Sequence, residues 1–226
     1  MTISHTLTIH HCRTLSPRST PRTQHLAALF GLDLDEPLEV ATLPPTELPV
    51  APGTILFVTG PSGGGKSTIL RCLARACRAH GRPVVDLQAL VVADDQPLVE
   101  TFPDRLDATT RHLARAGLAD ARDLLKTPSQ LSGGQYARYL LARAMAGAGH
   151  HDASVILADE FASTLDRVTA VTLCRLLRRW ITETGHTLVA ATTRDDLLAD
   201  LQPDAVAWKP LGDELQVVRR TREVMP

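Results

Sequence analysis

Short apolar runs alternate along the chain with longer segments in which apolar residues recur at helical spacing. The apolar runs, typical of strands buried on both faces, lie at 54–59, 154–158 and 187–191. The segments with helical spacing lie at 67–80, 132–148 and 168–184. This alternation predicts an α/β fold in which helices cover both faces of a mostly parallel sheet.

The N-terminal segments have weaker patterns. Residues 6–9 alternate like an edge strand, and the polar stretch 16–23 is loop-like. Residues 25–31 predict a short helix that ends at Gly31. The proline-rich segment 37–53 predicts extended strand or turn, because proline and the residue before it disfavour helix.

Three further segments complete the expected elements. Residues 84–85 continue as a short strand after the break at 81–83. Residues 97–130 are expected to be mostly helical and polar. The segment 205–218 predicts a terminal hairpin that turns at Gly212 and Asp213.

A glycine-rich loop follows the first buried strand and precedes a helix, and it matches G-x-x-x-x-G-K-[ST] without a mismatch. Its backbone N–H groups are expected to cradle phosphate oxygens. Lys66 would supply charge to the β- and γ-phosphates, and the Ser67 hydroxyl would hold Mg²⁺. The sequence therefore predicts ATP and Mg²⁺ as cofactors, bound by Gly60, Pro61, Ser62, Gly63, Gly64, Gly65, Lys66, Ser67 and Thr68.

Two acidic residues end the buried strand at 154–158. Ligand chemistry in open parallel sheets is concentrated at the carboxyl ends of the strands. Asp159 is placed to hold Mg²⁺, and Glu160 is placed to orient and activate an attacking water. An Asp-Glu pair alone would more often begin an ordinary loop, but the phosphate loop makes the catalytic interpretation the better one.

The run Leu131-Ser132-Gly133-Gly134-Gln135 precedes another helix, whose N-terminus Ser132 can cap. LSGGQ between the two nucleotide-binding motifs resembles the signature of ATP-binding cassette (ABC) ATPases, over most of residues 50–220. The resemblance implies a RecA-like P-loop NTPase core and a short helical subdomain carrying the signature. It also implies a head-to-tail homodimer, in which one copy's Ser132, Gly133, Gly134 and Gln135 contact the ATP held by the other.

The resemblance assigns further roles. It makes 163–166 the loop that crosses the dimer interface, and Gln96 the glutamine that reaches the metal and the water. The expected catalytic residues are then Glu160, Gln96 and Lys66, and the expected metal ligands are Ser67, Asp159 and Gln96. The resemblance implies that residues 1–226 form a single ABC-type ATPase domain, with an N-terminal strand and inserted helix in 1–50 and the short helical signature subdomain in 97–147.

The chain departs from the family pattern in several places. Thr193 stands where the family usually has a histidine, and threonine cannot carry imidazole's charge, so the rate of hydrolysis is open. His10 and His11 stand where an aromatic residue often stacks on adenine, and a histidine plane could replace it. The segment from Gln96 to the signature is shorter than in transporter subunits, and 16–37 is an addition.

The composition is that of an ordinary globular protein, and the formal net charge of −1 gives no general attraction to nucleic acid or anionic membrane. No stretch approaches the ~20 apolar residues of a membrane span. The N-terminus lacks the apolar core of a secretory signal. The four cysteines lack metal-ligand spacing, which predicts reduced thiols in a cytoplasmic protein. Any membrane association would come through a partner chain.

Three functional hypotheses are left open. The first is a soluble, non-transport ABC ATPase that hydrolyses ATP and acts on a protein or a nucleic acid. The second is the ATP-binding subunit of a transporter whose membrane permease is encoded separately. The third is an ATP-gated dimerisation module with little hydrolysis.

Overall fold

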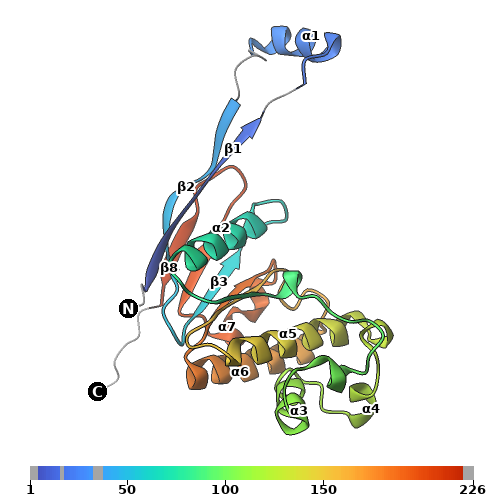
Figure 1. Ribbon diagram of the computed structural model, residues 1–226. Coiled ribbons are helices and arrows are strands. Elements are labelled where there is room, and N and C mark those ends of the chain that lie inside the picture. Colours follow the sequence, from blue (N-terminus) through green and yellow to red (C-terminus); the bar gives the residue numbers. More distant parts are fainter. Residues whose placement is uncertain (1–4, 16–17, 33–37, 221–226) are drawn as a thin grey trace, which may run out of the picture.

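The computed structural model describes residues 5–15, 18–32 and 38–220. Its core is a six-stranded sheet with the order β4-β5-β6-β3-β7-β8 (Figure 1). All strands run parallel except β8, which pairs antiparallel with β7 at one edge. The strands are β3 Ile55–Thr59, β4 Val84–Asp86, β5 Val155–Ala158, β6 Thr187–Ala191, β7 Ala205–Trp208 and β8 Gln216–Arg219. The predicted mostly parallel α/β fold is confirmed.

The central strands are buried on both faces, and alternate residues pack against different layers. Phe57, Ile156 and Leu188 pack in one core cluster with helices α5 (Gly133–Gly149) and α6 (Arg167–Thr184). Leu56 and Val189 pack on the opposite face in a second cluster, with helix α2 (Lys66–Ala79). The continuous apolar runs of the sequence therefore reflect a sheet covered on both sides.

An N-terminal hairpin forms a separate two-stranded antiparallel sheet of β1 (Thr6–Leu15) and β2 (Leu38–Pro49). Its near part packs on α2 through Leu7, Ile9, Leu43 and Leu48. Its far part rises away from the body and carries helix α1 (Pro21–Phe30) beyond its tip (Figure 1). The predicted edge strand is thus one arm of a much longer hairpin.

Helix α1 begins four residues earlier than the sequence pattern predicted, inside the expected loop 16–23. Thr20 and Thr23 form a reciprocal capping box, and Pro21 occupies the first helical position, where a missing N–H costs nothing. The helix ends at Gly31 as predicted, in the left-handed conformation (φ 63°). Its outer face leaves Leu29 and Phe30 about 70% exposed.

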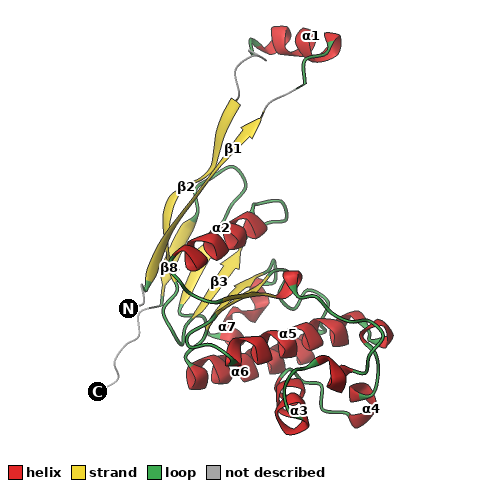
Figure 2. Cartoon of the chain, in the orientation of Figure 1, coloured by secondary structure: helices red, strands yellow, loops and turns green. Residues whose placement is uncertain are grey.

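The region from 97 to 131 forms short helices that pack on α5, at the far end of the body from the hairpin (Figure 2). Fully buried Leu98, Leu113 and Tyr139 form its core, and the Tyr139 hydroxyl bonds to Thr101 Oγ1 at 2.8 Å. It is less helical than expected, with η2 Leu98–Thr101, α3 Leu106–Arg115, α4 Ala121–Leu124 and η3 Pro128–Gln130. The other short helices are η1 Leu87–Ala89, η4 Asp195–Leu197 and α7 Leu198–Leu201.

The expected terminal hairpin is present as β7 and β8. Among the described helices, none combines the length and apolar character that crossing a bilayer requires. Because β3, β5 and β6 are adjacent and parallel, the loops after their carboxyl ends meet at one edge of the sheet. The phosphate loop, the Asp159-Glu160 pair and Thr193 belong to those three loops.

Candidate nucleotide-binding site

The phosphate loop runs from β3 into the N-terminus of α2, as the sequence predicted. Gly60 has φ 141°, and a Cβ added there would lie 2.2 Å from the carbonyl oxygen of Lys209. Gly65 occupies the N-cap of α2 in the left-handed conformation, with φ 93°. The loop can therefore curl tightly around an anion at the positive end of α2 only because glycine stands at both positions.

Lys66 extends back over the loop that it follows. Its ammonium group donates hydrogen bonds to the carbonyl oxygens of Gly60 (2.8 Å) and Pro61 (2.9 Å). It also lines a cavity of about 470 Å³ beside the loop. The cation is thus already held where a phosphate group would need a counter-charge.

The loop after β5 is held in an unusual backbone conformation. Glu160 has φ 50° and Ala162 has φ 56°, a left-handed region that residues with a Cβ seldom adopt. Asp159 accepts the N–H of Glu160 at 3.0 Å, and the N–H of Phe161 bonds to the carbonyl of Ala191 at the end of β6. Such strain, which costs about 1–3 kcal/mol per residue, is concentrated at functional sites.

The 470 Å³ cavity brings the three loops together. It is lined by the phosphate-loop residues Ser62, Gly63, Gly65, Lys66, Ser67 and Thr68, by Asp159, Glu160 and Ser163, and by Thr192 and Thr193. The hydroxyl of Ser67 and the carboxylate of Asp159 are oxygen donors of the kind that Mg²⁺ takes together with phosphate oxygens. The residues present therefore fit both a triphosphate and its magnesium ion.

Thr193 lines this cavity at the position where the family pattern has a histidine. The buried His186 cannot replace it, since His186 lies at the opposite end of β6 and accepts the N–H of Ser154 at 3.2 Å. Burial lowers the pKa of the His186 imidazole. The cavity thus contains a hydroxyl, and no imidazole, among its described lining residues.

Arg194 was not anticipated from the sequence. Its guanidinium donates to the carbonyl oxygens of Ala162 (3.0 Å) and Leu165 (2.8 Å), and pairs with Asp196 at 3.1 Å. It therefore joins the end of β6 to the strained loop after β5. An arginine beside an acidic residue gives no sign in the sequence that it will bridge two loops.

The structure does not bring Gln96 to the other expected site residues. Gln96 is exposed, two residues before η2, and is absent from the described linings of the cavities around the phosphate loop. Gln88 instead lines a neighbouring cavity of about 290 Å³ together with Asp159 and Glu160. Gln88 lies two residues after β4, and the sequence did not single it out because the pairing of β4 with β5 joins distant segments.

The signature segment forms the N-terminus of α5. Ser132 caps the helix, accepting the N–H of Gln135 at 3.3 Å, while the Gln135 side chain accepts the N–H of Ser132 at 3.0 Å. Gln135 also donates to Asp123 at 2.9 Å. A hydrogen bond from Lys126, and secondarily that from Gln135, lowers the pKa of Asp123. The helix end is therefore rigidly held.

Gly134 allows the signature to pack against the loop at 163–166. A Cβ there would lie 3.1 Å from Leu165 Cδ2 and 3.4 Å from the Thr164 carbonyl. None of the four signature residues belongs to the described linings of the two cavities that flank the phosphate loop. Gly133 instead lines the neighbouring 290 Å³ cavity together with Asp159 and Glu160, so within one copy the signature adjoins the carboxylates but not the phosphate loop.

A second cavity, of about 570 Å³, lies on the other side of the phosphate loop. His11, Leu43, Ile69 and Leu211 line it together with Gly63 to Gly65. His11 is half-buried, with Nδ1 2.6 Å from Thr42 Oγ1, whereas His10 is exposed. Because no Phe, Tyr or Trp is among the described residues that line this cavity, the His11 ring is the aromatic surface available to a base.

This geometry defines a P-loop nucleotide-binding protein. No protein-family model matches the chain. It is 34% identical over 171 residues to the aliphatic sulfonates import ATP-binding protein SsuB of Delftia acidovorans, covering 68% of each chain. It is 31% identical over 194 residues to the methionine import ATP-binding protein MetN of Haemophilus ducreyi, covering 71% of this chain and 55% of that protein. The match thus spans about half the length of MetN.

Among solved structures, the chain resembles the dimeric MJ0796, a bacterial ABC transporter cassette. The TM-score is 0.67 at 19% identity, over 96% of this chain and 99% of that one. The fold is therefore the α/β fold of an ABC cassette. With the sequence relatives, the phosphate loop and the LSGGQ segment, the chain belongs to the ATP-binding cassette ATPase family.

Proposed function

We propose that the chain binds Mg-ATP in the 470 Å³ cavity and hydrolyses it when a second copy closes over that cavity head to tail. The observation that carries this proposal is the meeting of Lys66, Ser67, Asp159 and Glu160 in one cavity, from loops about 100 residues apart in sequence. A phosphate cradle alone would bind nucleotide. The adjacent carboxylates add what a metal and an attacking water require.

Each residue has a distinct role in this proposal. The loop N–H groups and Lys66 bind the β- and γ-phosphates, while Ser67 and Asp159 hold Mg²⁺, which offsets charge on the transferred phosphoryl group. Glu160 orients the water and accepts its proton. Thr193 donates its hydroxyl to the γ-phosphate but adds no positive charge. Gln88 lines a cavity together with Asp159 and Glu160, and Gln96 lines none of the described cavities, so Gln88 is the better candidate to help position the water.

The signature completes the site from the second copy. The N-terminus of α5 presents backbone N–H groups held in place by Ser132 and Gln135, which suits it to contact phosphate. It does not face the phosphate loop of its own chain, so its contact with ATP requires a partner. The solved MJ0796 cassette that the chain resembles is dimeric, which supports this arrangement.

The similar proteins favour the hypothesis that ATP hydrolysis by this chain drives transport. SsuB and MetN are ATP-binding proteins of import systems, and this supports a transporter subunit with separately encoded membrane chains rather than a non-transport ATPase. One observation on this chain supports the other hypothesis, a non-transport role. The β1–β2 hairpin carries α1 clear of the body, so the chain has a projecting surface of its own (Figure 1).

The decisive substitution is Glu160→Gln. It keeps the side-chain shape but removes the proton acceptor, so ATPase activity is expected to fall about 100-fold or more while ATP still binds. The variant should therefore accumulate as a dimer at saturating Mg-ATP, measured by size-exclusion chromatography with light scattering.

Lys66→Ala is the control, because it removes the phosphate counter-charge and should abolish both ATP binding and dimer formation. A Glu160→Gln protein that stays monomeric with ATP bound would contradict the head-to-tail arrangement. Undiminished turnover in that variant would contradict the role of Glu160.

The choice between transport and non-transport roles needs a different experiment. If the protein serves a transporter, multi-span membrane proteins should co-purify with the ATP-bound Glu160→Gln protein after crosslinking in its native host. Recovery of only non-membrane partners would favour the non-transport role.

A further inference from the structure

A groove of about 420 Å³ adjoins the exposed side of α2. It is lined by Arg71, Arg75 and Arg78, by His11 of β1, by Asp86 at the end of β4, and by Thr68, Cys72 and Ala74. The three arginines follow one another at helical spacing and are all exposed, so they form one basic face. They are called the α2 basic face below.

The arginines of this face form no ion pair with a described carboxylate, although Asp86 lines the same groove. Helix α2 contains four basic residues and no acidic one. Arg71 donates to Thr68 Oγ1 at 3.0 Å and Arg75 to Cys72 Sγ at 3.3 Å. Among the described residues, no carboxylate lies within ion-pair distance of the three guanidinium groups. Asp86, which lines the groove, accepts the N–H of Gln88 instead.

Helix α6 shows how the same chain treats exposed arginines elsewhere. Arg175 pairs with Asp200 at 3.0 Å, and Arg179 pairs with Glu183 at 2.6 Å. These two arginines share the spacing of Arg71 and Arg75, but each has an acidic partner. The absence of such partners on α2 therefore distinguishes its basic face from an ordinary solvated helix surface.

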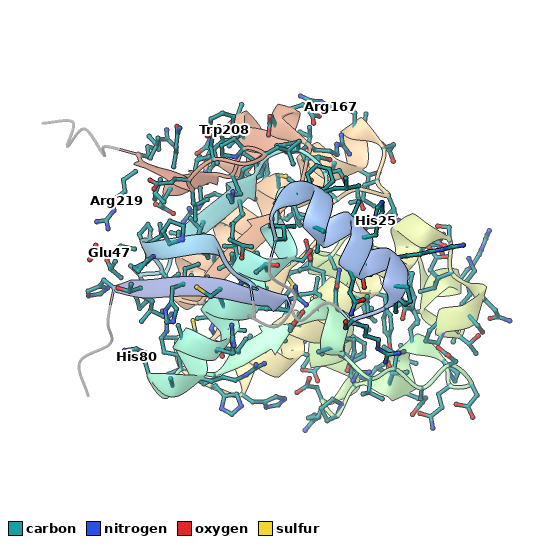
Figure 3. All side chains as sticks on the ribbon, turned by 90° about the horizontal axis from the view of Figure 1, so that it is seen from above. His25, Glu47, His80, Arg167, Trp208 and Arg219 are labelled. Carbon is teal, nitrogen blue, oxygen red and sulfur yellow. The ribbon has the colours of Figure 1, made fainter. Side chains whose placement is uncertain are left out.

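The N-terminal hairpin adjoins the α2 basic face and carries a few basic residues in its first half. Strand β1 lies beside α2, as Figures 1 and 3 both show. Residues 1–32 contain no aspartate or glutamate, although the whole chain has a net charge of −1. Arg18 and Arg22 are exposed near the start of α1, and His25 is exposed on that helix (Figure 3). The hairpin as a whole is not basic, because its second half contains Asp33, Asp35, Glu36, Glu39 and Glu47, so the uncompensated positive charge is that of α2.

We propose that the α2 basic face binds the sugar-phosphate backbone of a nucleic acid strand, independently of base sequence. Guanidinium groups present planar forks that match phosphate oxygens, and arginine is preferred over lysine at such contacts. A row of three arginines along one groove fits an extended polyanion better than a single small anion. The row of three arginines, none of which forms an ion pair with a described carboxylate, favours a phosphate chain over a compact acidic protein.

This inference goes beyond ATP hydrolysis and does not depend on it. Thr68 and His11 line both the groove and a cavity beside the phosphate loop, so the two sites adjoin, but the three arginines line only the groove. Nucleic acid and Mg-ATP are therefore expected to bind at the same time. Lys66→Ala should lose ATP and keep nucleic acid, which separates the failure of one proposal from the failure of the other.

The test is fluorescence anisotropy of the full chain with a labelled single-stranded oligonucleotide of about 20 nucleotides. With about three phosphate contacts, the affinity should fall about 20-fold between roughly 50 and 200 mM salt. Arg75→Ala/Arg78→Ala should reduce the affinity at low salt at least about tenfold. In this variant the affinity should fall only about threefold over the same range of salt. Arg75→Lys/Arg78→Lys should retain most of the affinity, since the charge remains.

Arg175→Ala/Arg179→Ala is the matched control, because it removes two exposed arginines from another helix and changes the net charge equally. Its affinity should stay within about twofold of the wild type, since the charge it removes does not contact phosphate. Equal loss in both double variants would mean a response to net charge alone and would overturn the proposal. Unchanged binding in Arg75→Ala/Arg78→Ala, displacement of the oligonucleotide by Mg-ATP, or stronger binding of poly-glutamate would overturn it as well.

Discussion

Gly60 occupies a position where the backbone leaves no room for a side chain. Its φ of 141° and the 2.2 Å approach of a Cβ to the Lys209 carbonyl both exclude other residues without movement of β7 or the phosphate loop. The carbonyl of Gly60 also accepts a hydrogen bond from Lys66. One residue therefore links the sheet, the loop and the cation that would meet phosphate.

Gly60→Ala should consequently weaken ATP binding at least about tenfold and lower the free energy of unfolding by about 1–3 kcal/mol, since strained backbone and overpacking each cost that order. Calorimetry with Mg-ATP and urea unfolding measure the two effects. Gly149→Ala is the matched control: a Cβ there meets nothing within 4 Å, and the residue closes α5. Equal ATP affinity in Gly60→Ala and wild type would show that the phosphate loop accommodates the added methyl group, and would contradict this prediction.

At the scale of elements, the loops after β5 and β6 act as one unit because Arg194 joins them. Its bonds to the carbonyls of Ala162 and Leu165 help to hold the turn that contains Glu160 in its left-handed conformation. Arg194 does not line the described cavity with Glu160, so it is a positioning residue. Its effect should therefore fall on the reaction and not on nucleotide binding.

Arg194→Ala is expected to lower kcat about tenfold to a hundredfold, because small displacements of a reacting group cost rates of that order, while KM for ATP changes little. Arg194→Lys keeps the charge but cannot donate to both carbonyls in the same planar geometry, so it should restore only part of the rate. Steady-state ATPase assays measure both constants. A rise in KM at constant kcat would instead place Arg194 in nucleotide binding.

The elements also show what sequence patterns could and could not predict. The start of α5 follows from Ser132 and Gln135, since a capping box acts within one turn. The start of α1 at Pro21 rests on a comparable local signal, Thr20 with Thr23, that hydrophobic periodicity does not register. Gln88 could not be distinguished from Gln96, because that required knowing that β4 ends at Asp86 beside β5, a pairing between distant segments.

At the scale of the whole molecule, the hairpin divides into a part that belongs to the body and a part that does not. Leu7 and Ile9 are buried against α2 with their partners on β2, and the ladder continues outward to the pair Leu15 and Leu38. The far part and α1 lie beyond the sheet that holds the nucleotide site (Figure 1). Hence the body should fold and bind ATP without them.

A shortened chain tests this division. Replacing residues 14–39 with Asn-Gly would close the hairpin at the pair Arg13 and Val40, with a two-residue turn suited to antiparallel strands. Because the buried positions of β1 and β2 remain, the free energy of unfolding should change by less than about 1 kcal/mol, and ATP affinity should be unchanged. The oligonucleotide should still bind at the α2 basic face with the same salt dependence, because Arg71, Arg75 and Arg78 remain. Loss of ATP binding in this variant would mean that the arm is part of the nucleotide site.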